Sequence, residues 1–364
     1  MKRVLILTTI MAPYRVDLFN QLGKFCELTV CFEQHIDSIR SSEWYGDKVT
    51  NFNFVTLKNW DKPIGKVKFD ITKYINKKWF DLAIAYEFST PTALVFMFLC
   101  KIKGIPYFIN CDGGFINTHF IKDKIKRFFI KSATICLAGS EHASQYFIQF
   151  GAKPGNIHRH NFTSLCTEDI LNELISQKEC LKMKLGLYSD KKYVLSVGQF
   201  IHRKGYDVLI NAWSQVDPNY ELLIIGGGEK LKEHTNQIKE LGLKNVTLKE
   251  FTKKEELSEH YKACDLFVLP TREDVWGLVI NEAMSKGLPV IATNKCVAGL
   301  ELIKDYENGF IVPVDDEKTL SHRISEILMD ENIQKSMGEN NLKKIKTYTI
   351  DNIAKSHIEV IENT

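Results

Sequence analysis

Residues 267–293 combine two short apolar runs with a helical segment between them, an order that restricts the chain to a parallel α/β architecture. The first run is stopped by Pro270, and the second, 290–292, is β-branched and follows a Gly-Leu-Pro break. We expect a helix over 277–286 between these two strands. The loop 271–276 then falls at the carboxyl end of the first strand, where open α/β sheets bind ligands.

Similar apolar runs recur along the whole chain and alternate with helical segments. One helix is predicted from the apolar face formed by Val16, Phe19 and Leu22. Two more are predicted over 91–103 and near 122–131. The predicted strands are 2–9, 28–32, 81–85, 106–109, 134–138, 193–197, 221–225, 246–248, 266–269 and 290–292. Strands and helices that alternate in this way imply doubly wound parallel sheets.

The chain has 364 residues, which is enough for two domains at ~100–200 residues per domain. The first series of strands ends near Phe162, and the pattern restarts after a charged stretch. We therefore expect an N-terminal Rossmann-like domain over 1–165, a charged helical connector within 166–190 and a C-terminal Rossmann-like domain over 191–345.

Charge and cysteine content exclude several classes of function. Lys and Arg exceed Asp and Glu by only 48 − 45 = 3, so no overall field favours nucleic acid. The nine cysteines form no C-x-x-C pair and no zinc spacing, which indicates buried reduced thiols, no metal site and a cytoplasmic location. The start of the chain is unlike a signal peptide, and the most apolar run, 93–100, is shorter than the ~18 residues of a membrane span.

The predicted helix start after 271–276 has the features of an anion site. Unpaired N–H groups of Gly277, Leu278 and Val279 would suit a diphosphate. Asp274 precedes this helix, and Glu282 lies in its second turn with a side chain that leans back toward the helix start. A carboxylate that accepts hydrogen bonds from vicinal hydroxyls can hold a sugar or a ribose. A solvated helix carboxylate is the alternative interpretation of Glu282.

These residues resemble a motif of the retaining glycosyltransferases of family 4, which have the GT-B fold of two Rossmann-like domains facing across a cleft. The family motif is a carboxylate, seven residues and then Glu, wrapped around Gly-Leu and followed by Ala-Met and Gly-x-Pro-Val. Here it reads Asp274, Gly277-Leu278, Glu282-Ala283-Met284 and Gly287-Leu288-Pro289-Val290. The resemblance covers most of residues 190–320. The first carboxylate is usually Glu, so Glu273 is an alternative to Asp274.

The resemblance implies roles for these groups. Glu282 would hold the ribose of a nucleotide-sugar donor, and Asp274 would hold the donor sugar. The last segment, 346–364, would cross back onto the N-terminal domain. Gly226-Gly227-Gly228 would either line the nucleotide or serve as a simple turn, and the base would lie near a backbone contact at Phe251.

A cationic loop follows the predicted strand 193–197. Gly198 permits a tight exit from the strand, and Arg203 and Lys204 place two positive charges near its end. In the family an Arg directly after the Gly and a Lys before a later Gly contact the donor diphosphate. Lys204 matches, whereas Gln199 occupies the Arg position, so Arg203 would supply the second charge. A solvated loop is the alternative. Because the chain has no D-x-D pattern to hold a divalent metal, these cations would stabilise the leaving diphosphate without one.

The N-terminal half offers three candidates for the acceptor side, Tyr14, Arg15 and Glu87, and a further catalytic candidate, Asp112, beside the proposed catalytic carboxylates Asp274 and Glu282. Tyr14 and Arg15 follow a turn stiffened by proline, although Arg15 is alternatively an exposed first-turn residue. Asp112 stands where family members carry a His that meets the donor sugar; it would accept from hydroxyls or assist deprotonation of the acceptor, or else form a turn. Glu87 follows strand 81–85 and is either an acceptor contact or a helix cap.

Residues 118–133 alternate cations with large apolar side chains. Such a basic amphipathic helix would lie against anionic lipid, with each exposed cation contributing ~1 kcal/mol near the surface. A core helix with a solvated Lys face is the alternative. Membrane contact would place the protein at the inner face of the plasma membrane.

Together these features predict a retaining, metal-independent glycosyltransferase without a bound cofactor and without a nucleic-acid partner. It would move a sugar from a UDP-linked donor to a glycan or lipid-linked acceptor in surface polysaccharide biosynthesis. No covalent nucleophile is evident, which favours same-face attack guided by the leaving phosphate. The alternatives are a GT-B sugar-nucleotide epimerase or hydrolase, and a non-catalytic partner subunit, suggested by Gln199, Asp112 and Asp274 standing where the family has other residues.

Overall fold

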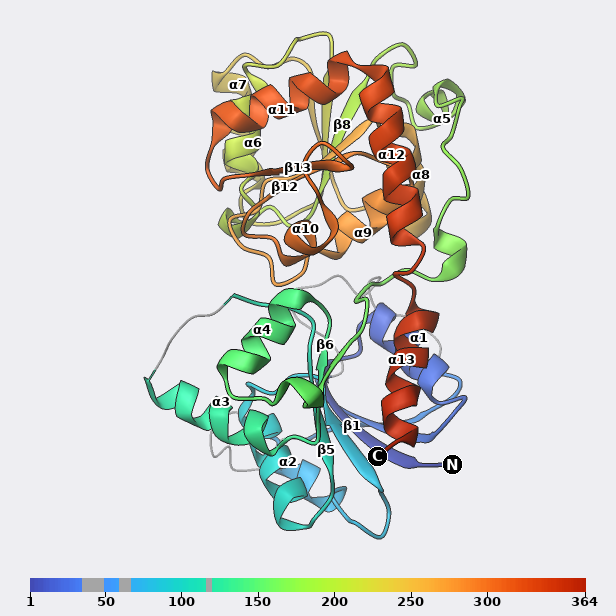
Figure 1. Cartoon of the computed structure of the whole chain (residues 1–364). Helices are drawn as coiled ribbons and strands as arrows, with labels where there is room; N and C mark the ends of the chain where they lie inside the picture. Colours follow the sequence, from blue (N-terminus) through green and yellow to red (C-terminus); the bar gives the residue numbers. More distant parts are fainter. Residues whose placement is uncertain (35–48, 59–66, 116–119) are drawn as a thin grey trace. The chain divides into compact units, whose positions relative to one another are not determined.

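A computed structural model describes residues 1–34, 49–58, 67–115 and 120–364 (Figure 1). The chain divides into two compact units, residues 1–164 with 349–364, and residues 165–348. Each unit has its own sheet and its own buried apolar core, so each is described by itself.

Unit 1 is built on a parallel sheet of seven strands in the described residues, in the order β3-β2-β1-β4-β5-β6-β7. The first strand, β1, pairs with β2 and β4 on its two sides, so the strand order reverses there. The strands are β1 (Arg3–Ile10), β2 (Glu27–Gln34), β3 (Asn53–Thr56), β4 (Leu82–Ala85), β5 (Tyr107–Cys111), β6 (Ile135–Ala138) and β7 (Ile157–Arg159).

Helices cover both faces of this sheet, as the alternating sequence pattern predicts. The last helix of the chain packs against the first one and shields that side of the unit (Figure 1). Pro13 fits the first position of its helix because its missing N–H has no helical partner there anyway. The helices are α1 (Pro13–Leu22), α2 (Pro91–Ile102), α3 (Phe120–Ser132), α4 (Glu141–Gln149), α13 (Ile350–Glu362) and the short 3-10 turns Phe69–Lys73 and Pro154–Asn156.

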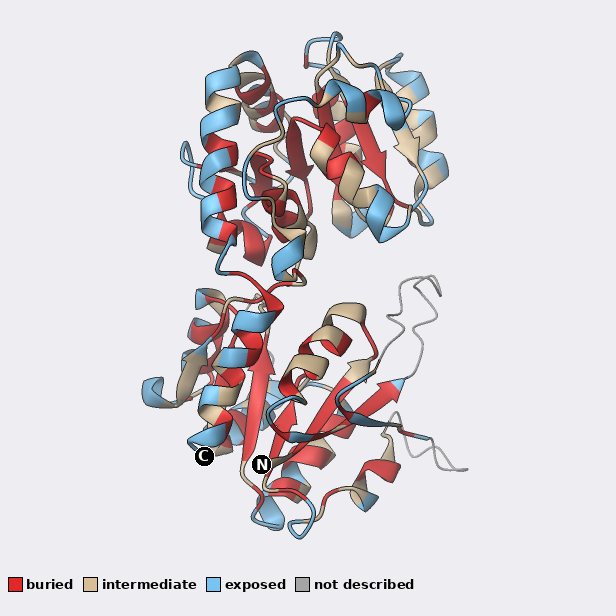
Figure 2. Cartoon of the chain, turned by 90° about the vertical axis from the view of Figure 1, so that its right-hand side faces the viewer, coloured by how far each residue is buried: buried red, intermediate tan, exposed pale blue. Residues whose placement is uncertain are grey.

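Burial on both faces explains why the central strands read as continuous apolar runs. Val4, Leu5, Ile6 and Leu7 of β1 are all fully buried, and Figure 2 shows the strands as the buried layer of the unit. Phe96 of α2 is also fully buried in this core, so its truncation to Ala would cost roughly 3–5 kcal/mol.

Unit 2 has a second parallel sheet, of six strands, in the order β10-β9-β8-β11-β12-β13. The order reverses at β8, which pairs with β9 and β11. Ligands of such sheets bind outside the carboxyl ends at this reversal. The strands are β8 (Tyr193–Val197), β9 (Glu221–Ile225), β10 (Val246–Lys249), β11 (Leu266–Leu269), β12 (Val290–Thr293) and β13 (Gly309–Val312).

The helices of unit 2 again lie on both faces of its sheet (Figure 1). Trp213 anchors the core between α6 and α11, and it is almost fully buried. The helices are α5 (Glu179–Lys184), α6 (Tyr206–Trp213), α7 (Leu231–Glu240), α8 (Lys254–Ala263), α9 (Leu278–Ser285), α10 (Val297–Leu302), α11 (Glu317–Met329), α12 (Glu331–Ile345) and the 3-10 turns Thr167–Asp169 and His202–Lys204.

The charged connector predicted within 166–190 is helical only in part. This segment contains only a 3-10 turn, Thr167–Asp169, and the single short helix α5, and the rest is irregular. Lys178 and Lys182 of this segment make ion pairs of 3.1 and 3.2 Å with Asp265, so the connector follows the surface of unit 2.

The structure shows the state of the cysteines and the extent of the apolar helices. All nine cysteines are free, and seven of them are buried, while Cys166 is half-buried and Cys180 is exposed. Within the described ranges, we find no helix with both the length and the apolar content needed to cross a bilayer.

Candidate functional site

The cationic loop after β8 is fixed to the loop after β11 by hydrogen bonds through its backbone. The carbonyl of Arg203 accepts from the N–H of Arg272 at 2.8 Å and from the hydroxyl of Thr271 at 3.0 Å. Gly205 has a left-handed φ of 68°, and a Cβ there would lie 2.2 Å from the carbonyl oxygen of Pro270. Glycine is therefore required for the close approach that holds the 3-10 turn His202–Lys204 at the end of β11.

Lys204 forms an ion pair with Asp274. Its Nζ lies 2.5 Å from Oδ2 of Asp274, and Nη1 of Arg203 lies 3.7 Å from Oδ1. The side chains of Lys204 and Asp274 are only 12% and 15% exposed, whereas that of Arg203 is 45% exposed. Salt screens a partly buried pair much less than a surface pair. Asp274 is thus the carboxylate next to the cations, while Glu273 is exposed and offers its carbonyl to Arg203 at 2.6 Å.

The start of α9 lies directly beside this ion pair. Gly277 is the N-cap residue in a left-handed conformation, with φ 100°, and a Cβ there would be 2.7 Å from Sγ of Cys296 and 3.9 Å from Cγ of Asp274. The first N–H groups of a helix have no carbonyl partner one turn earlier. Those of Gly277, Leu278 and Val279 therefore add the positive end of the helix dipole to the charges of Lys204 and Arg203.

Glu282, in the second turn of α9, is half-buried and accepts a hydrogen bond of 3.0 Å from the hydroxyl of Tyr261. Burial raises the pKa of Glu282, and the nearby cations Lys254 and Lys286 oppose this effect only in part. Lys286 is itself bonded to the carbonyl of Asp169 in the connector. This environment differs from that of a solvated helix carboxylate, because the side chain is partly buried and accepts a hydrogen bond from the Tyr261 phenol.

Glycine loops after β8 and β9 pack on each other at the same edge of the sheet. The N–H of Phe200 donates to the carbonyl of Gly227 at 2.8 Å, and a Cβ on Gly226 would lie 1.8 Å from the carbonyl oxygen of Gly198. The ring of Phe251, 54% exposed, lies over Gly227. The structure therefore brings Gly198 and Phe251 to the same rim of the unit 2 sheet.

The predicted residues of unit 1 also meet at one edge of a sheet. Arg15 in α1 is 2% exposed, and its Nη2 lies 2.5 Å from Oδ2 of Asp112, which follows β5. Its guanidinium carbon is 4.5 Å from the ring centre of Tyr86 and 5.1 Å from that of Tyr14. The alternative of an exposed Arg15 is therefore wrong, since aromatic rings cover the charge.

Glu87 follows β4 and belongs to the same group of charges. It accepts a hydrogen bond of 3.0 Å from the N–H of Thr9. Burial and the neighbouring Asp112 raise the pKa of Glu87, while Arg15 opposes the shift. The alternative that Glu87 caps a helix is wrong, because Thr90 caps α2 through a 3.0 Å bond from the N–H of Ala93.

Two buried histidines, His160 and His357, support this group; neither has metal-ligand spacing in the sequence, which is typical of structural histidines. Nε2 of His160 is 3.2 Å from Oδ1 of Asn110, which in turn donates to Asp112 at 2.8 Å. His357 of α13 has its ring centre 4.8 Å from that of His160. Burial lowers the pKa of His160 well below its usual value and that of His357 to about 3. The position of His357 on the apolar face of the last helix is the sequence feature that indicates its burial.

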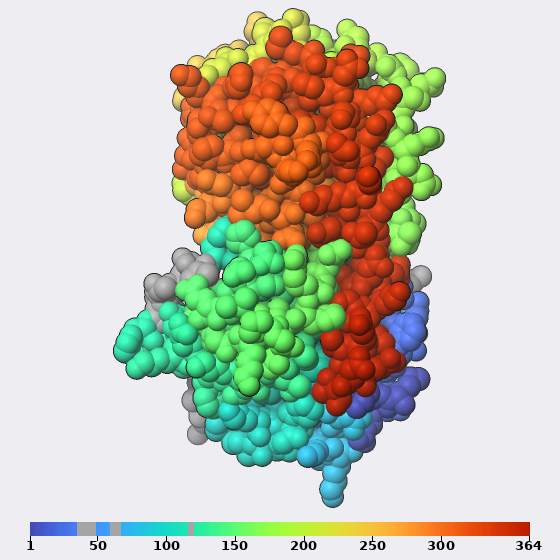
Figure 3. All heavy atoms as spheres, in the orientation of Figure 1, coloured from blue at the N-terminus to red at the C-terminus, as the bar shows by residue number. Residues whose placement is uncertain are grey.

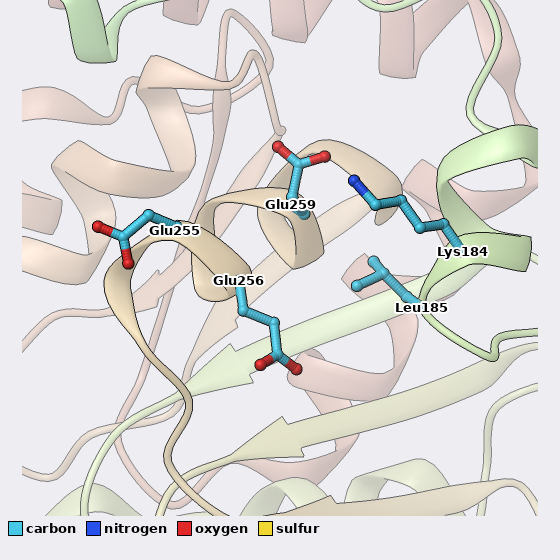
Figure 4. Close-up of a pocket in the computed structure, with 5 residues that line it drawn as sticks. All are labelled: Lys184, Leu185, Glu255, Glu256 and Glu259. Carbon is cyan, nitrogen blue, oxygen red and sulfur yellow. The ribbon is translucent and has the colours of Figure 1, made fainter.

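A surface pocket elsewhere in unit 2 contains none of these predicted residues. Figure 4 shows Lys184 and Leu185 on one side of it, from α5 and its end, and three glutamates of α8 on the other. Two of these carboxylates are already paired, Glu256 with Lys249 at 2.8 Å and Glu259 with Lys262 at 2.7 Å. The three glutamates are Glu255, Glu256 and Glu259.

The unit that contains Lys204, Asp274 and Glu282 is also the part of the chain that matches a known protein family. Residues 177–344 match the family model "Glycosyl transferases group 1". An uncharacterized glycosyltransferase of Methanocaldococcus jannaschii is 32% identical over 44% of this chain and 45% of its own length. A lipopolysaccharide core biosynthesis glycosyltransferase of Rhizobium meliloti is 27% identical over 43% of this chain and 46% of its own length.

A third relative is the amylovoran biosynthesis glycosyltransferase AmsD of Erwinia amylovora, 25% identical over 40% of this chain and 41% of its own length. In general the chain spans about half the length of the curated relatives it matches, because the alignments cover 45%, 48% and 47% of the first three. The sequence likeness to glycosyltransferases thus extends over at most about half of the chain.

Solved structures extend the likeness to the whole chain. HepE of Anabaena in complex with UDP superimposes with a TM-score of 0.80 at 18% identity, covering 100% of both chains. A sucrose-phosphate synthase from Thermosynechococcus elongatus gives a TM-score of 0.77 at 18% identity over 100% of this chain and 99% of its own. These likenesses show the fold, and the predicted GT-B class with two Rossmann-like parallel sheets is confirmed.

Proposed function

We propose that this protein is a retaining glycosyltransferase that moves a sugar from a UDP-linked donor to a glycan or lipid-linked acceptor. The observation that carries the proposal is the Lys204–Asp274 pair at the start of α9, with Arg203 beside it. The family match over 177–344 covers these residues. UDP is favoured because HepE, a protein of similar fold, was solved with it. Surface polysaccharide biosynthesis is favoured because two relatives are named for lipopolysaccharide core and amylovoran biosynthesis.

In this proposal the donor diphosphate binds at the start of α9. The N–H groups of Gly277, Leu278 and Val279 and the cations of Lys204 and Arg203 would balance its charge. Lys204 would then be shared between a phosphate oxygen and Asp274, to which it is bonded in the free protein. The 12% exposure of the Lys204 side chain favours a strong contact, because little water competes with the phosphate.

The two motif carboxylates would hold the hydroxyl groups of the donor. Glu282 is one turn further along α9 and would accept from the ribose, with Tyr261 fixing its second oxygen. Asp274 would hold the donor sugar. Gly198 would leave room for the nucleotide, and Phe251 would contact the base, since both lie at the rim formed by the loops after β8, β9 and β10.

On the acceptor side we propose Asp112, Glu87, Arg15 and Tyr14. Asp112 would accept from an acceptor hydroxyl and assist its deprotonation, and Arg15 would fix one oxygen of that carboxylate through the 2.5 Å bond. Arg15 is a positioning residue in this scheme, because aromatic rings cover the rest of its guanidinium. A lipid-linked acceptor agrees with a cytoplasmic protein in contact with an anionic membrane through 118–133, of which 118 and 119 lie outside the described residues.

We propose further that the reaction needs no divalent metal and proceeds by same-face attack. The cations and the helix start would stabilise the leaving diphosphate, which would take the proton of the acceptor as the new bond forms with retained configuration, while Asp112 assists by holding the acceptor hydroxyl. Transfer should therefore persist in EDTA. Loss of activity in EDTA that Mg²⁺ restores would contradict this part of the proposal, and product NMR would report the anomeric configuration.

The direct test of donor binding is a thermal-shift comparison of UDP, GDP and ADP. A nucleotide at a hundredfold excess over its dissociation constant stabilises the folded protein by ~2.7 kcal/mol. We expect the largest shift with UDP. A larger shift with GDP or ADP would correct the base. No shift with any of them would favour a non-catalytic subunit, and rapid conversion of a sugar nucleotide without acceptor would favour an epimerase or hydrolase.

A further inference from the structure

Helix α3 turns large apolar side chains toward solvent. Phe120, Ile121, Ile125 and Phe128 are 78%, 71%, 40% and 47% exposed. Residues 121, 125 and 128 are spaced by four and three, so they lie in one stripe along the helix. A helix that only covered the core would hide such a stripe and present its lysines alone. Helix α3 does bury Phe129 and Ile130 in the core of unit 1, but a core helix with a solvated Lys face does not account for the exposed stripe.

Helix α2 continues this apolar surface. Phe98 and Ile102 are 48% and 64% exposed and, four residues apart, share one face of α2. Lys101, on the same face, connects the two helices: its Nζ donates to Oγ of Ser132 at 2.6 Å and lies 4.2 Å from the ring centre of Phe128. The two helices pack side by side in unit 1, and in Figure 3 α3 stands out at the edge of that unit.

The charges around these side chains are nearly all positive. In the described residues of α2 and α3 there is one acid, Asp123, and it is half-buried. Five cations are exposed among and beside the apolar side chains. They are Lys101, Lys122, Lys124, Arg127 and Lys131.

We propose that the exposed faces of α2 and α3 form one surface, the α2–α3 surface, that binds anionic lipid headgroups at a bilayer. Charge complementarity selects this partner, because the five cations fit phosphate-bearing headgroups and the apolar side chains between them fit the acyl boundary below. The surface extends beyond the basic segment recognised in the sequence, since Phe98, Lys101 and Ile102 belong to it. It lies in unit 1 and does not depend on the nucleotide site of unit 2.

The strength and salt dependence of binding follow from this arrangement. Each exposed cation near an anionic membrane surface strengthens binding by about fivefold at low ionic strength, and the effect falls off within a Debye length. Binding should therefore weaken as salt rises. The apolar side chains should keep a residual affinity that salt does not remove.

Flotation of the full chain with vesicles tests the surface. Equimolar phosphatidylcholine and phosphatidylglycerol vesicles should carry the protein upward at low salt, and pure phosphatidylcholine vesicles should carry much less. Lys101→Gln and Lys124→Gln should each weaken binding by about fivefold. Lys355→Gln, an exposed lysine of α13, is the matched control and should leave binding unchanged.

The apolar contribution is tested in the same way. Phe98→Ser should lower binding in high as well as low salt, whereas Phe25→Ser, at 56% exposure outside both helices, should not. Each variant should retain the far-UV circular dichroism and the nucleotide-induced thermal shift of the parent, which separates a failure here from a failure of the donor site.

Several outcomes would overturn the α2–α3 surface. Absence of binding to anionic vesicles at low salt would remove it entirely, and equal binding to neutral vesicles would remove its electrostatic basis. If only Lys124→Gln had an effect, the part assigned to α2 would be wrong. A concentration-dependent dimer that Phe98→Ser dissolves, with no lipid binding, would assign the same surface to a second copy of the chain.

Discussion

At the scale of single residues, Lys204 is the group on which donor binding depends most. Its ammonium is largely shielded and sits at the start of α9, so it is placed for a charge-assisted bond to a phosphate. Lys204→Met should weaken UDP binding by about 10- to 100-fold, the equivalent of losing one hydrogen bond to a charged group. Uridine, which has no phosphate, should bind the variant and the parent equally. Calorimetric titration with both ligands makes the comparison.

The matched control for this change is Lys232→Met, an exposed lysine of α7. It should alter neither affinity. An equal loss of uridine and UDP binding in Lys204→Met would indicate a distorted loop, and unchanged UDP binding would show that the diphosphate does not contact Lys204.

The ionised Glu282 carboxylate should lower the stability of the folded protein while it provides a contact to the ribose. Burial raises its pKa, so ionisation costs free energy in the folded state. Below the unfolded pKa of about 4.3 both states are protonated and the group has no effect, and the cost grows as pH rises through the folded pKa. Glu282→Gln should therefore be more stable than the parent at pH about 7 and equal to it at pH about 4, while binding UDP more weakly.

Urea unfolding at the two pH values measures this difference. Glu240→Gln, an exposed carboxylate of α7, is the control and should change stability at neither pH. A Glu282→Gln protein that is less stable at neutral pH would show that the ionised carboxylate stabilises the fold, contrary to the burial argument.

At the scale of elements, α13 contributes a pH-dependent contact to unit 1. His357 is buried against His160 and Tyr86, and burial lowers its pKa to about 3. It is neutral in the folded state, whereas an unfolded histidine protonates near pH 6.5. The stability it provides is complete above about pH 6.5 and is lost as pH falls toward the folded pKa, at up to ~1.36 kcal/mol per pH unit.

His357→Phe should reduce this slope by about one proton, because the ring remains but the titration does not. Unfolding of unit 1 between pH about 4 and 7, followed by hydrogen exchange of its peptides, measures the slope. His322→Phe in α11, whose side chain is 73% exposed, should leave it unchanged. An unaltered slope in His357→Phe would assign the acid sensitivity to other groups, with His160 first.

The connector is fixed to unit 2 through Asp265. This carboxylate accepts from Lys178, Lys182 and the N–H of Tyr193, and these charges lower its pKa despite burial. Asp265→Asn would leave the buried ammonium of Lys182 without its counter-charge, so unit 2 should lose roughly 3–5 kcal/mol of stability. Asp190→Asn, an exposed acid of the same connector, should cost little. Urea unfolding of both variants measures the difference. Equal free energies of unfolding for Asp265→Asn and Asp190→Asn would contradict a stabilising role of the Lys182–Asp265 pair.

The same elements show what a sequence can predict and what it cannot. Central strands such as β1 and β8 are buried on both faces, so they read as continuous apolar runs and are predicted closely. Strands β3, β7 and β13 are not predicted, because each is an edge strand that is short and partly exposed or begins with glycine. The connector is predicted only in part because the partner of its lysines, Asp265, lies more than 80 residues further along.

The candidate sites follow the same rule. Asp274, Gly277 and Glu282 are visible in the sequence because a strand, a turn and a helix start bring them together locally. The Arg15–Asp112 pair joins residues 97 positions apart, and His357 reaches His160 from the far end of the chain. Such contacts depend on the strand order and on where α13 packs. The local periodicity of apolar residues predicts neither of these.

At the scale of the whole molecule, two units with separate cores should respond to separate ligands. The groups proposed for UDP binding lie in unit 2, and the contacting pair of buried histidines, His160 and His357, lies in unit 1. UDP at a hundredfold excess over its dissociation constant should slow exchange from the open state of unit 2 by about 100-fold, which corresponds to ~2.7 kcal/mol. Unit 1 should be unaffected. Mild acid, at pH about 5, should speed exchange in unit 1 more than in unit 2, after correction for the intrinsic rate. Burial lowers the pKa of His234 and His260 in unit 2 as well, but it lowers that of His160 well below the usual value and that of His357 to about 3.

Hydrogen exchange resolved by peptide, with and without UDP, distinguishes this behaviour from a single cooperative transition. Peptides of β1 and β5 report on unit 1, and those of β8 and β12 report on unit 2. If UDP protected all four strands equally, the molecule would unfold as one body, and ligand binding in unit 2 would stabilise the acceptor-side groups as well. Protection confined to β8 and β12 would mean that donor binding leaves the stability of the Arg15–Asp112 region unchanged. Any ordering of the acceptor side would then have to come from the acceptor itself.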